Sequence, residues 1–371
     1  MSAHHDREAL KTRQAKLGES MRAAGVDVFL ASSPVTMAYL SGFGEFGYER
    51  ILQLALHADG RVAMICPSLT ATAARRAGLA DVRPWSDAEN PEVLMQALAD
   101  EWELESAVIG VDRDMAAAHL LAWQGLLPAA LFRNGQPVVA QLMMQKDPSE
   151  LALLEHAAGI ADAAWDSVRP SLRPGMTERE VAGLLSRAME QRGGKPTFTL
   201  VAAGANGAEP HHETDDTVLQ TGDVVVIDFG CEWAGYQSDI TRTICLGAAT
   251  PDQQAVYSTV YRAFLAGRAA VREGVTGADV DAAARQVIAD AGWGEFFVHR
   301  TGHGIGMRGH EEPYIASTNS EPLRSGNCFS IEPGIYLPGQ FGVRIENIVT
   351  CTADGHRSLN AEPSPTLLEL G

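Results

Sequence analysis

Two aspartates occupy what the sequence predicts to be a single β-hairpin in the C-terminal half of the chain. Asp228 ends a β-branched run, Asp239 lies in an alternating stretch, and the loop between them, residues 230–235, begins and ends with glycine. A hairpin symmetric about Trp233 and Ala234 would place the two aspartates directly opposite each other, with their Cβ atoms about 5 Å apart. Facing carboxylates repel each other, and a bound cation would remove that repulsion.

Two glutamates repeat the arrangement further along the chain. Glu332 and Glu346 flank the turn signal Pro338-Gly339, and reflection about Gly339 places Glu332 opposite Glu346. Pro333 directly follows Glu332 and could bulge the first strand, which would shift this pairing. The sequence therefore predicts a second pair of facing carboxylates.

A histidine completes the set. His303 lies between the two carboxylate pairs in a glycine-rich segment, residues 302–306. A lone aspartate on a hairpin is usually a solvated turn residue, but here five candidate ligands occur together. Two divalent cations would balance the four carboxylates, and carboxylates with one imidazole suit Mn²⁺, Co²⁺ or Zn²⁺ better than a soft metal such as Cu(I). We therefore predict a site for two divalent metal ions.

In this order the five residues resemble the two-metal set of the pita-bread metallopeptidases, which include methionine aminopeptidase, aminopeptidase P and prolidase. The matching strings are VIDFG (226–230), SDITRT (238–243), GHGIG (302–306), IEPG (331–334) and RIE (344–346). The resemblance is strong over the C-terminal half and looser over the N-terminal half. It implies a metal-ligand set of Asp228, Asp239, His303, Glu332 and Glu346.

The elements that must position these residues divide into two domains, which we place at residues 1–145 and 146–371. The first half alternates helices and strands, which is typical of a mixed α/β domain. The predicted elements are helices at 7–24, 69–78 and 91–102 and strands at 26–31, 51–56, 62–66 and 108–111. The string MAYLSGF (37–43) resembles one in the N-terminal domain of the creatinase, prolidase and aminopeptidase P group, which methionine aminopeptidases usually lack.

The second half alternates helix pairs with the two hairpins. We predict helices at 148–167, 177–191, 252–272 and 277–291, with a capping box at Thr177 and Glu180 opening the second of them. Two helix pairs, each near one metal-binding hairpin, fit an internally duplicated domain. The expected fold class is an α/β N-terminal domain followed by an α+β pita-bread catalytic domain.

Further histidines bear on the mechanism. By the resemblance, His211 and His310 would contact the substrate near the scissile bond, and His299 would line the leaving-group side of the site. His212 directly follows His211, and the sequence does not decide which of the two faces the site. Arg344, two residues before Glu346, would orient the metal ligands.

The resemblance implies hydrolysis by a hydroxide that bridges the two metals, since metal-bound water is acidified to a nucleophile near neutral pH. Glu332 would be both a ligand and the proton acceptor, and the imidazoles would stabilise the developing oxyanion. Together with Arg344, Tyr236 and Thr241 are candidates for orienting the ligands.

The two-domain organisation and the histidines resemble the proline-directed branch, whose substrates are peptides with proline at the second position. Dipeptidases of this branch often carry a basic residue shortly after the second histidine, whereas here that stretch begins with Glu311 and Glu312. Two acids would repel a dipeptide's C-terminal carboxylate. The sequence therefore favours an aminopeptidase P over an Xaa-Pro dipeptidase (prolidase), unless an arginine from elsewhere or from a second subunit reaches that carboxylate.

Two other readings are open alternatives. Some relatives hydrolyse non-peptide amides or cleave sulfonium compounds, and others are non-catalytic binding proteins on the same fold. A non-catalytic protein would be expected to have lost ligands, and this chain retains all five.

The composition agrees with a soluble enzyme. The net charge of −18 argues against nucleic acid or an anionic membrane as a partner. The five cysteines are scattered without a Cys-x-x-Cys motif, and the charged N-terminus has no apolar signal core, so a reducing cytoplasm is expected. We expect a homodimer with peptides as its only other partners.

Overall fold

The computed structural model describes residues 7–371, so most of the charged N-terminal stretch considered above lies outside the described residues. The chain forms two compact units, Met1–Met143 and Met144–Gly371, close to the predicted division between residues 145 and 146. Within residues 7–371 no helix is long and apolar enough to cross a membrane. All five cysteines are buried as free thiols.

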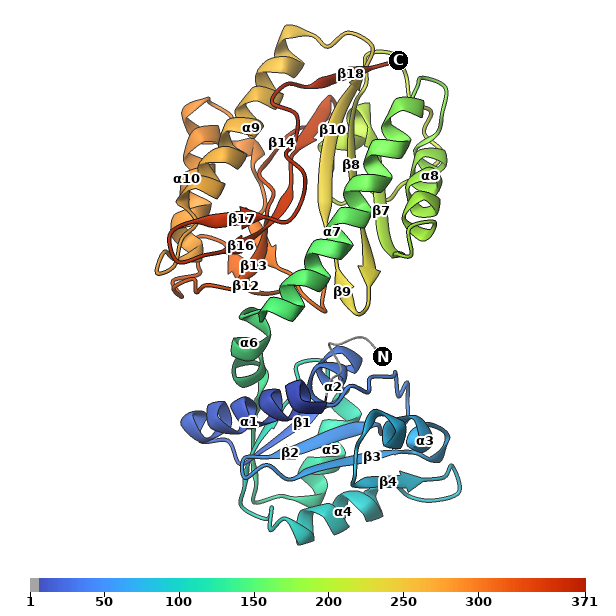
Figure 1. The fold of residues 1–371 in the computed structure, drawn as a ribbon, viewed down its shortest axis with the longest axis vertical. Coiled ribbons are helices and arrows are strands. Elements are labelled where there is room, and N and C mark those ends of the chain that lie inside the picture. Colours follow the sequence, from blue (N-terminus) through green and yellow to red (C-terminus); the bar gives the residue numbers. More distant parts are fainter. Residues whose placement is uncertain (1–6) are drawn as a thin grey trace. The chain divides into compact units, whose positions relative to one another are not determined.

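The N-terminal unit contains a six-stranded mixed sheet with the strand order β4-β3-β2-β1-β5-β6 (Figure 1). Its strands are β1 (Val28–Ala31), β2 (Gln53–His57), β3 (Val62–Pro67), β4 (Val82–Trp85), β5 (Val108–Val111) and β6 (Leu131–Asn134). Its helices are α1 (Arg7–Ala24), α2 (Pro34–Ser41), α3 (Ser68–Ala77), α4 (Glu92–Glu101) and α5 (Ala117–Leu126), followed by α6 (Gln136–Met144), which reaches the boundary between the units.

The four predicted strands of this unit correspond to β1, β2, β3 and β5, whereas the two edge strands were not predicted. The edge strand β4 contains Pro84, which lacks a backbone N–H and is tolerated only at a sheet edge. The opposite edge strand, β6, is mostly exposed and lacks an apolar pattern. Their short, irregular sequences therefore gave no strand signal.

The C-terminal unit has four long helices, each opened by a complete capping box. These helices are α7 (Pro148–Val168), α8 (Glu178–Glu190), α9 (Pro251–Ala270) and α10 (Gly277–Asp290). The N-cap side chain of each helix accepts a hydrogen bond from the third helical N–H, and the side chain at that third position accepts from the backbone N–H of the N-cap residue. The four N-cap residues are Asp147, Thr177, Thr250 and Thr276. The predicted capping box at Thr177 and Glu180 is confirmed.

The strands of this unit form two five-stranded sheets and a separate two-stranded ribbon. The first sheet contains β7 (Lys195–Ala203), β8 (Val224–Trp233), β9 (Tyr236–Gln237), β10 (Ile240–Leu246) and β18 (Leu368–Leu370). The second contains β11 (Gly302–Gly304), β12 (Glu311–Ile315), β13 (Cys328–Ile331), β16 (Asn347–Cys351) and β17 (His356–Ser358). The ribbon pairs β14 (Gly334–Leu337) with β15 (Phe341–Arg344).

Each helix pair shares an apolar core with the strands that hold one pair of carboxylates. Val181 of α8 and Phe229 of β8 belong to one fully buried cluster, and Phe264 of α9 and Ile331 of β13 belong to another. Complete burial of such a side chain contributes roughly 1.5–3 kcal/mol. The two cores therefore fix β8 and β13, which lead directly to the predicted ligands, as rigid supports.

Candidate metal centre

The aspartate hairpin differs in register from the prediction. Its turn is Ala234-Gly235, with φ angles of 50° and 88°, which fits a two-residue type I′ turn because both central residues have positive φ. Asp228 consequently lies opposite Thr241 and not opposite Asp239. The predicted direct opposition is wrong by two residues. Because strand side chains alternate with a period of two, Asp239 still belongs to the same face as Thr241 and is a diagonal neighbour of Asp228.

The glutamate hairpin has the predicted register. Strands β14 and β15 reflect about Gly339, with Gly334 opposite Arg344. Two residues further out, this reflection places Glu332 opposite Glu346. Both glutamates lie just outside the two-stranded ribbon, where the chain passes into the larger sheet.

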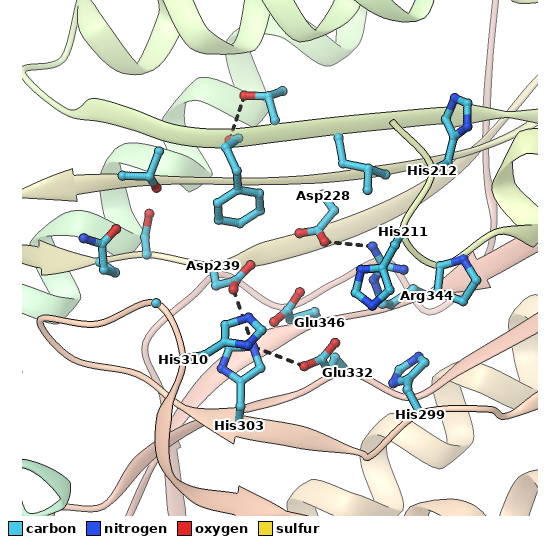
Figure 2. Close-up of a pocket in the computed structure, with 18 of the residues that line it drawn as sticks. His211, His212, Asp228, Asp239, His299, His303, His310, Glu332, Arg344 and Glu346 are labelled. Carbon is cyan, nitrogen blue, oxygen red and sulfur yellow. Dashed lines mark hydrogen bonds and ion pairs between the residues drawn. The ribbon is translucent and has the colours of Figure 1, made fainter. Parts of the chain in front are cut away.

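All five predicted ligands line one cleft of about 1080 Å³ in the C-terminal unit (Figure 2). Ligand atoms of His303, Glu332 and Glu346 lie within 4.8 Å of one another, and so do those of Asp228, Asp239 and Glu346. Glu346 is common to both groups. The five side chains could therefore hold two neighbouring divalent cations.

The carboxylates have unpaired oxygens that a cation would satisfy. Within residues 7–371, the buried oxygens Oδ1 of Asp228, Oδ1 of Asp239 and Oε1 of Glu346 have no hydrogen-bond partner, which is costly in a protein interior. Burial, followed by repulsion from the neighbouring carboxylates, raises the pKa values of Asp239 and Glu346 well above their ordinary range. The donor set therefore fits divalent metal ions.

His303 presents a free lone pair to this set. Its Nδ1 lies 3.1 Å from the carbonyl oxygen of Gly304, which can only accept, so Nδ1 carries the proton. Nε2 then lies unprotonated 3.3 Å from Glu332 Oε1 and 3.7 Å from Asp239 Oδ2. Burial lowers the pKa of His303 to about 4, so the imidazole is neutral near pH 7, as a metal ligand must be.

Arg344 connects the two hairpins. Its Nη2 donates to Asp228 Oδ2 at 2.7 Å, and its Nε donates to Thr241 Oγ1 at 3.2 Å. Thr241 in turn donates to Glu346 Oε2 at 2.7 Å. One guanidinium thus holds a ligand of the first hairpin directly and a ligand of the second through one hydroxyl, in agreement with the expected orienting contacts of Arg344 and Thr241.

The tyrosine that reaches the ligand set is not the predicted one. The Tyr236 hydroxyl donates to Glu150 Oε1 at 2.7 Å, away from the ligands, so its proposed orienting contact is wrong. Tyr336 on β14 instead accepts from Arg344 Nη1 at 2.9 Å and lies 2.8 Å from His299 Nε2. Arg344, Tyr336 and His299 therefore form one chain of hydrogen bonds along the cleft.

Ser330 is a further residue that sequence reasoning missed. Its hydroxyl accepts from the backbone N–H of His303 and donates to Glu332 Oε1, both at 2.9 Å. The available signal was its position two residues before Glu332, on the same strand face. Burial raises the pKa of the Glu332 carboxyl above its ordinary value.

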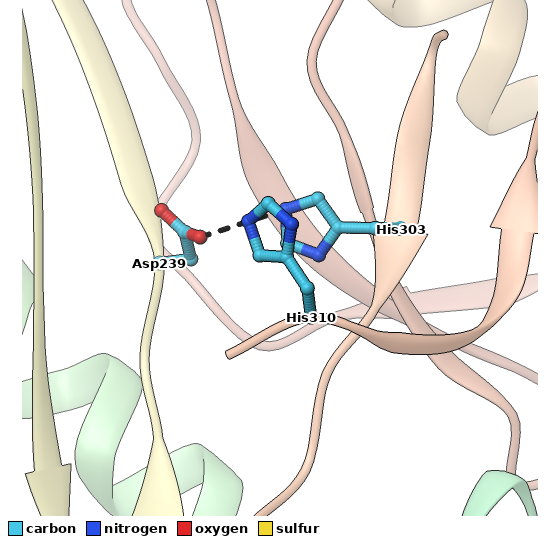
Figure 3. Close-up of side chains that lie close together, drawn as sticks. All are labelled: Asp239, His303 and His310. Carbon is cyan, nitrogen blue, oxygen red and sulfur yellow. Dashed lines mark ion pairs between the residues drawn. The ribbon is translucent and has the colours of Figure 1, made fainter. Parts of the chain in front are cut away.

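The three predicted substrate histidines, His211, His299 and His310, line the same cleft. Both members of the neighbouring pair border the cleft, but His211 points toward the carboxylates, whereas the His212 ring turns away and donates from Nε2 to Glu178 Oε2 at 2.8 Å (Figure 2). His310 stacks on His303 with ring centroids 3.7 Å apart (Figure 3).

The segment after His310 differs from expectation. Glu311 is only 3% exposed and forms a buried ion pair with Lys146, so the prediction that its carboxylate would repel a substrate is wrong. The positively charged side chain of Arg300 lines the cleft instead. Arg300 Nη2 donates to His310 Nδ1 at 3.2 Å, and its guanidinium carbon lies 4.4 Å from the centroid of the Tyr314 ring.

Comparison with known proteins agrees with this geometry. Residues 152–353 match the model of metallopeptidase family M24, and residues 13–144 match the creatinase/prolidase N-terminal domain. The probable dipeptidase PepE of Mycobacterium tuberculosis is 38% identical, with 98% of this chain and 97% of that protein covered. The Xaa-Pro dipeptidase of Lactobacillus delbrueckii subsp. lactis is 36% identical, with 92% and 95% covered.

A solved structure extends the similarity to the whole fold. The crystal structure of dipeptidase PepE from Mycobacterium ulcerans matches with a TM-score of 0.92 and 40% identity, covering 98% of both chains. The M24 match alone spans more than half of this chain. The predicted fold class and family resemblance are therefore confirmed. The chain is a peptidase that belongs to metallopeptidase family M24, with a creatinase/prolidase-type N-terminal domain.

Proposed function

We propose that the protein is a metal-dependent Xaa-Pro dipeptidase. This proposal reverses the preference for an aminopeptidase P drawn from the sequence, and a single observation carries it. The cleft contains a guanidinium, that of Arg300, beside His310, and the nearby acid Glu311 is turned into the interior.

Arg300 is suited to the C-terminal carboxylate of a dipeptide. A guanidinium has five N–H donors, and its bond to His310 uses one of them. The ring of Tyr314 supports its position. Arg344 also lines the cleft, but each of its three nitrogens already donates, to Thr241, Tyr336 and Asp228 respectively. Arg300 is therefore the better candidate for a bidentate contact with a substrate carboxylate.

The relatives support the same choice. The Lactobacillus protein is named an Xaa-Pro dipeptidase, and the mycobacterial protein a probable dipeptidase. With similarity over nearly the full length of both proteins, we infer the same class of substrate, a dipeptide with proline in second position. We further propose that Mn²⁺, Co²⁺ or Zn²⁺ supports the activity and that the enzyme acts in the cytoplasm as a homodimer.

The residues of the cleft have separate tasks in this reaction. Two divalent ions held by Asp228, Asp239, His303, Glu332 and Glu346 would supply Lewis acidity that lowers the pKa of water. Glu332 would accept the proton from the attacking water and pass it to the leaving proline nitrogen.

The imidazoles would stabilise the charge that develops on the substrate carbonyl. Burial lowers the pKa of His310 to about 4, so the ring is neutral. Because its Nδ1 accepts from Arg300, its proton is on Nε2, which can donate to the substrate oxygen. His211 faces the same space from the opposite wall (Figure 2), and His299 is held by Tyr336.

The first experiment compares an Xaa-Pro dipeptide with the matching Xaa-Pro-Xaa tripeptide, with Mn²⁺, Co²⁺ and Zn²⁺ each supplied. We expect a kcat/KM at least about tenfold higher for the dipeptide, because a charge-assisted hydrogen bond contributes roughly 1.5–3 kcal/mol. A tenfold preference for the tripeptide would restore the aminopeptidase P reading.

The second experiment isolates Arg300. Arg300→Met should lower kcat/KM about 10- to 100-fold for the dipeptide but little for the dipeptide amide, which carries no C-terminal charge. Arg324→Met, at an exposed arginine outside the cleft, is the matched control. An equal loss with both substrates would show that Arg300 does not bind the carboxylate.

A further inference from the structure

A buried carboxylate on α8 holds the loop that carries His211. Glu178, the first residue of α8, is completely buried and accepts four hydrogen bonds from a single stretch of chain. Its donors are Ala203 N at 2.8 Å, Asn206 Nδ2 at 3.0 Å, His212 Nε2 at 2.8 Å and Asp215 N at 3.2 Å. They span the connection from the end of β7 through residues 204–217, so one side chain fastens both ends and the middle of this loop.

His211 depends on that loop for its position. Within residues 7–371 its imidazole makes no hydrogen bond, although it lines the cleft opposite the metal ligands. Its direction is therefore set by the backbone. The next residue, His212, points to the other side and is tied to Glu178 (Figure 2). Fixing His212 outward turns His211 inward.

The cluster of Glu178, His212 and Asp215 is not better explained as another metal centre, although its potential ligand atoms lie close together. Both oxygens of Glu178 already face N–H groups, two of them from the backbone. Asp215 Oδ1 accepts from the backbone N–H of Thr217 at 2.7 Å. A cation would have to displace these donors, so the cluster is a hydrogen-bonded anchor.

We propose that Glu178 is a positioning residue, which acts through His212 to keep His211 directed at the substrate. This inference rests on the proposed function, in which His211 contacts the peptide. It adds a residue outside the cleft to the parts that set catalytic efficiency. Misplacing a reacting or substrate-binding group by about 1 Å can cost roughly 100-fold in rate, so a loop anchor of this kind affects turnover without touching the substrate.

The test is a double-mutant cycle on kcat/KM for an Xaa-Pro dipeptide. Glu178→Gln removes the charge and turns an amide N–H₂ toward donors, and we expect it to lower kcat/KM by about 10- to 100-fold. Because Glu178 acts through His211, His211→Ala should already include this loss. The double variant should therefore match His211→Ala within about twofold, since residues acting as a unit are not additive.

Two companion variants keep the test decisive if Glu178→Gln folds poorly. His212→Gln places an amide N–H near the position of Nε2 and should retain most of the activity, whereas His212→Leu should reproduce the loss. Glu180→Gln is the matched control, because Glu180 lies in the same helical turn but is exposed and accepts from the Thr177 backbone N–H. Metal content should equal that of the wild type in all of these variants.

The outcomes separate this proposal from the proposed function. If the wild-type protein cleaves no Xaa-Pro dipeptide, the proposed function fails. If it does cleave them, but Glu178→Gln lowers kcat/KM by the same factor with and without His211, the positioning proposal is overturned. Equal activity of the His212→Gln and His212→Leu variants, or loss of bound metal in Glu178→Gln, would also overturn it.

Discussion

The aspartate hairpin and the glutamate hairpin both bring two carboxylates to one cleft, but only the second has the register that the sequence predicts. Reflection about Gly339 correctly places Glu332 opposite Glu346. In the first hairpin the true partner of Asp228 is Thr241. The difference lies in the turns. Pro338-Gly339 is a turn signal that identifies the centre of its hairpin from the sequence. Ala234, in contrast, occupies a left-handed conformation that non-glycine residues rarely adopt.

The wrong register nevertheless left the predicted ligand set intact. Moving the centre of a hairpin by one residue moves every partner by two, and two residues return a side chain to the same face of the strand. Asp239 therefore still lies on the face of Asp228. The identity of the predicted ligands is therefore less sensitive to turn geometry than the predicted spacing between them.

The largest effect is expected at the glutamate hairpin. Glu332→Gln removes the proposed proton acceptor and one anionic ligand while keeping the side-chain shape. We expect kcat to fall by about 10³-fold or more, since general base catalysis alone contributes roughly 10²–10⁴-fold. Steady-state kinetics on a sample with a native circular dichroism spectrum would measure this, with the exposed Glu321→Gln as control. Near-normal turnover would remove Glu332 from the mechanism.

A smaller loss is expected from cutting the link between the hairpins. Arg344→Met removes the contact with Asp228 and the path through Thr241 to Glu346. Groups that orient metal ligands typically contribute 10- to 100-fold to metal affinity or activity, so we expect a loss in that range. Thr241→Val should cost less, because it cuts only the branch to Glu346. A larger loss in Thr241→Val than in Arg344→Met would reverse the proposed order of the network.

At both hairpins, a metal ion should compete with protons for the carboxylates. The pKa values of Asp239 and Glu346 are raised, mainly by burial, so these groups hold protons at pH values where ordinary carboxyls have lost them. A metal ion must displace those protons, so its affinity should rise with pH, by up to about tenfold per unit for each proton displaced. Calorimetric titration with Mn²⁺ between pH 6 and pH 8 checks the sign, and an affinity independent of pH would contradict it.

The smallest effects are expected at the turns themselves, with opposite signs. Gly339 has a φ of 70° and open space at its Cβ position, so Gly339→Ala should destabilise by about 1–2 kcal/mol through backbone strain alone. Ala234→Asn should stabilise by roughly 0.5–1 kcal/mol, because Asn-Gly suits a type I′ turn. Urea unfolding measures both. If both substitutions changed the free energy of unfolding in the same direction, the result would argue against the turn conformations assigned to Gly339 and Ala234.

The sequence was sufficient to predict the residues that a local sequence pattern marks. The five ligands lie in glycine-rich or alternating strings, and the long helices are marked by capping boxes at residues such as Thr177. The missing residues are defined by side-chain contacts that no local sequence pattern marks. Arg300 and Tyr336 matter because folding places them beside His310 and Arg344. Glu311 was misjudged because its partner, Lys146, lies 165 positions earlier in the chain.

The most direct test of the central claim, that the two hairpins together hold two metal ions, is the stoichiometry of metal binding. Chelator-treated protein should be inactive and should bind two Mn²⁺ ions per chain on titration, with activity returning as the sites fill. The matched variant Asp239→Asn should bind fewer ions with unchanged secondary structure. Full activity after exhaustive metal removal, or a titration in which no ion binds, would contradict the two-metal site.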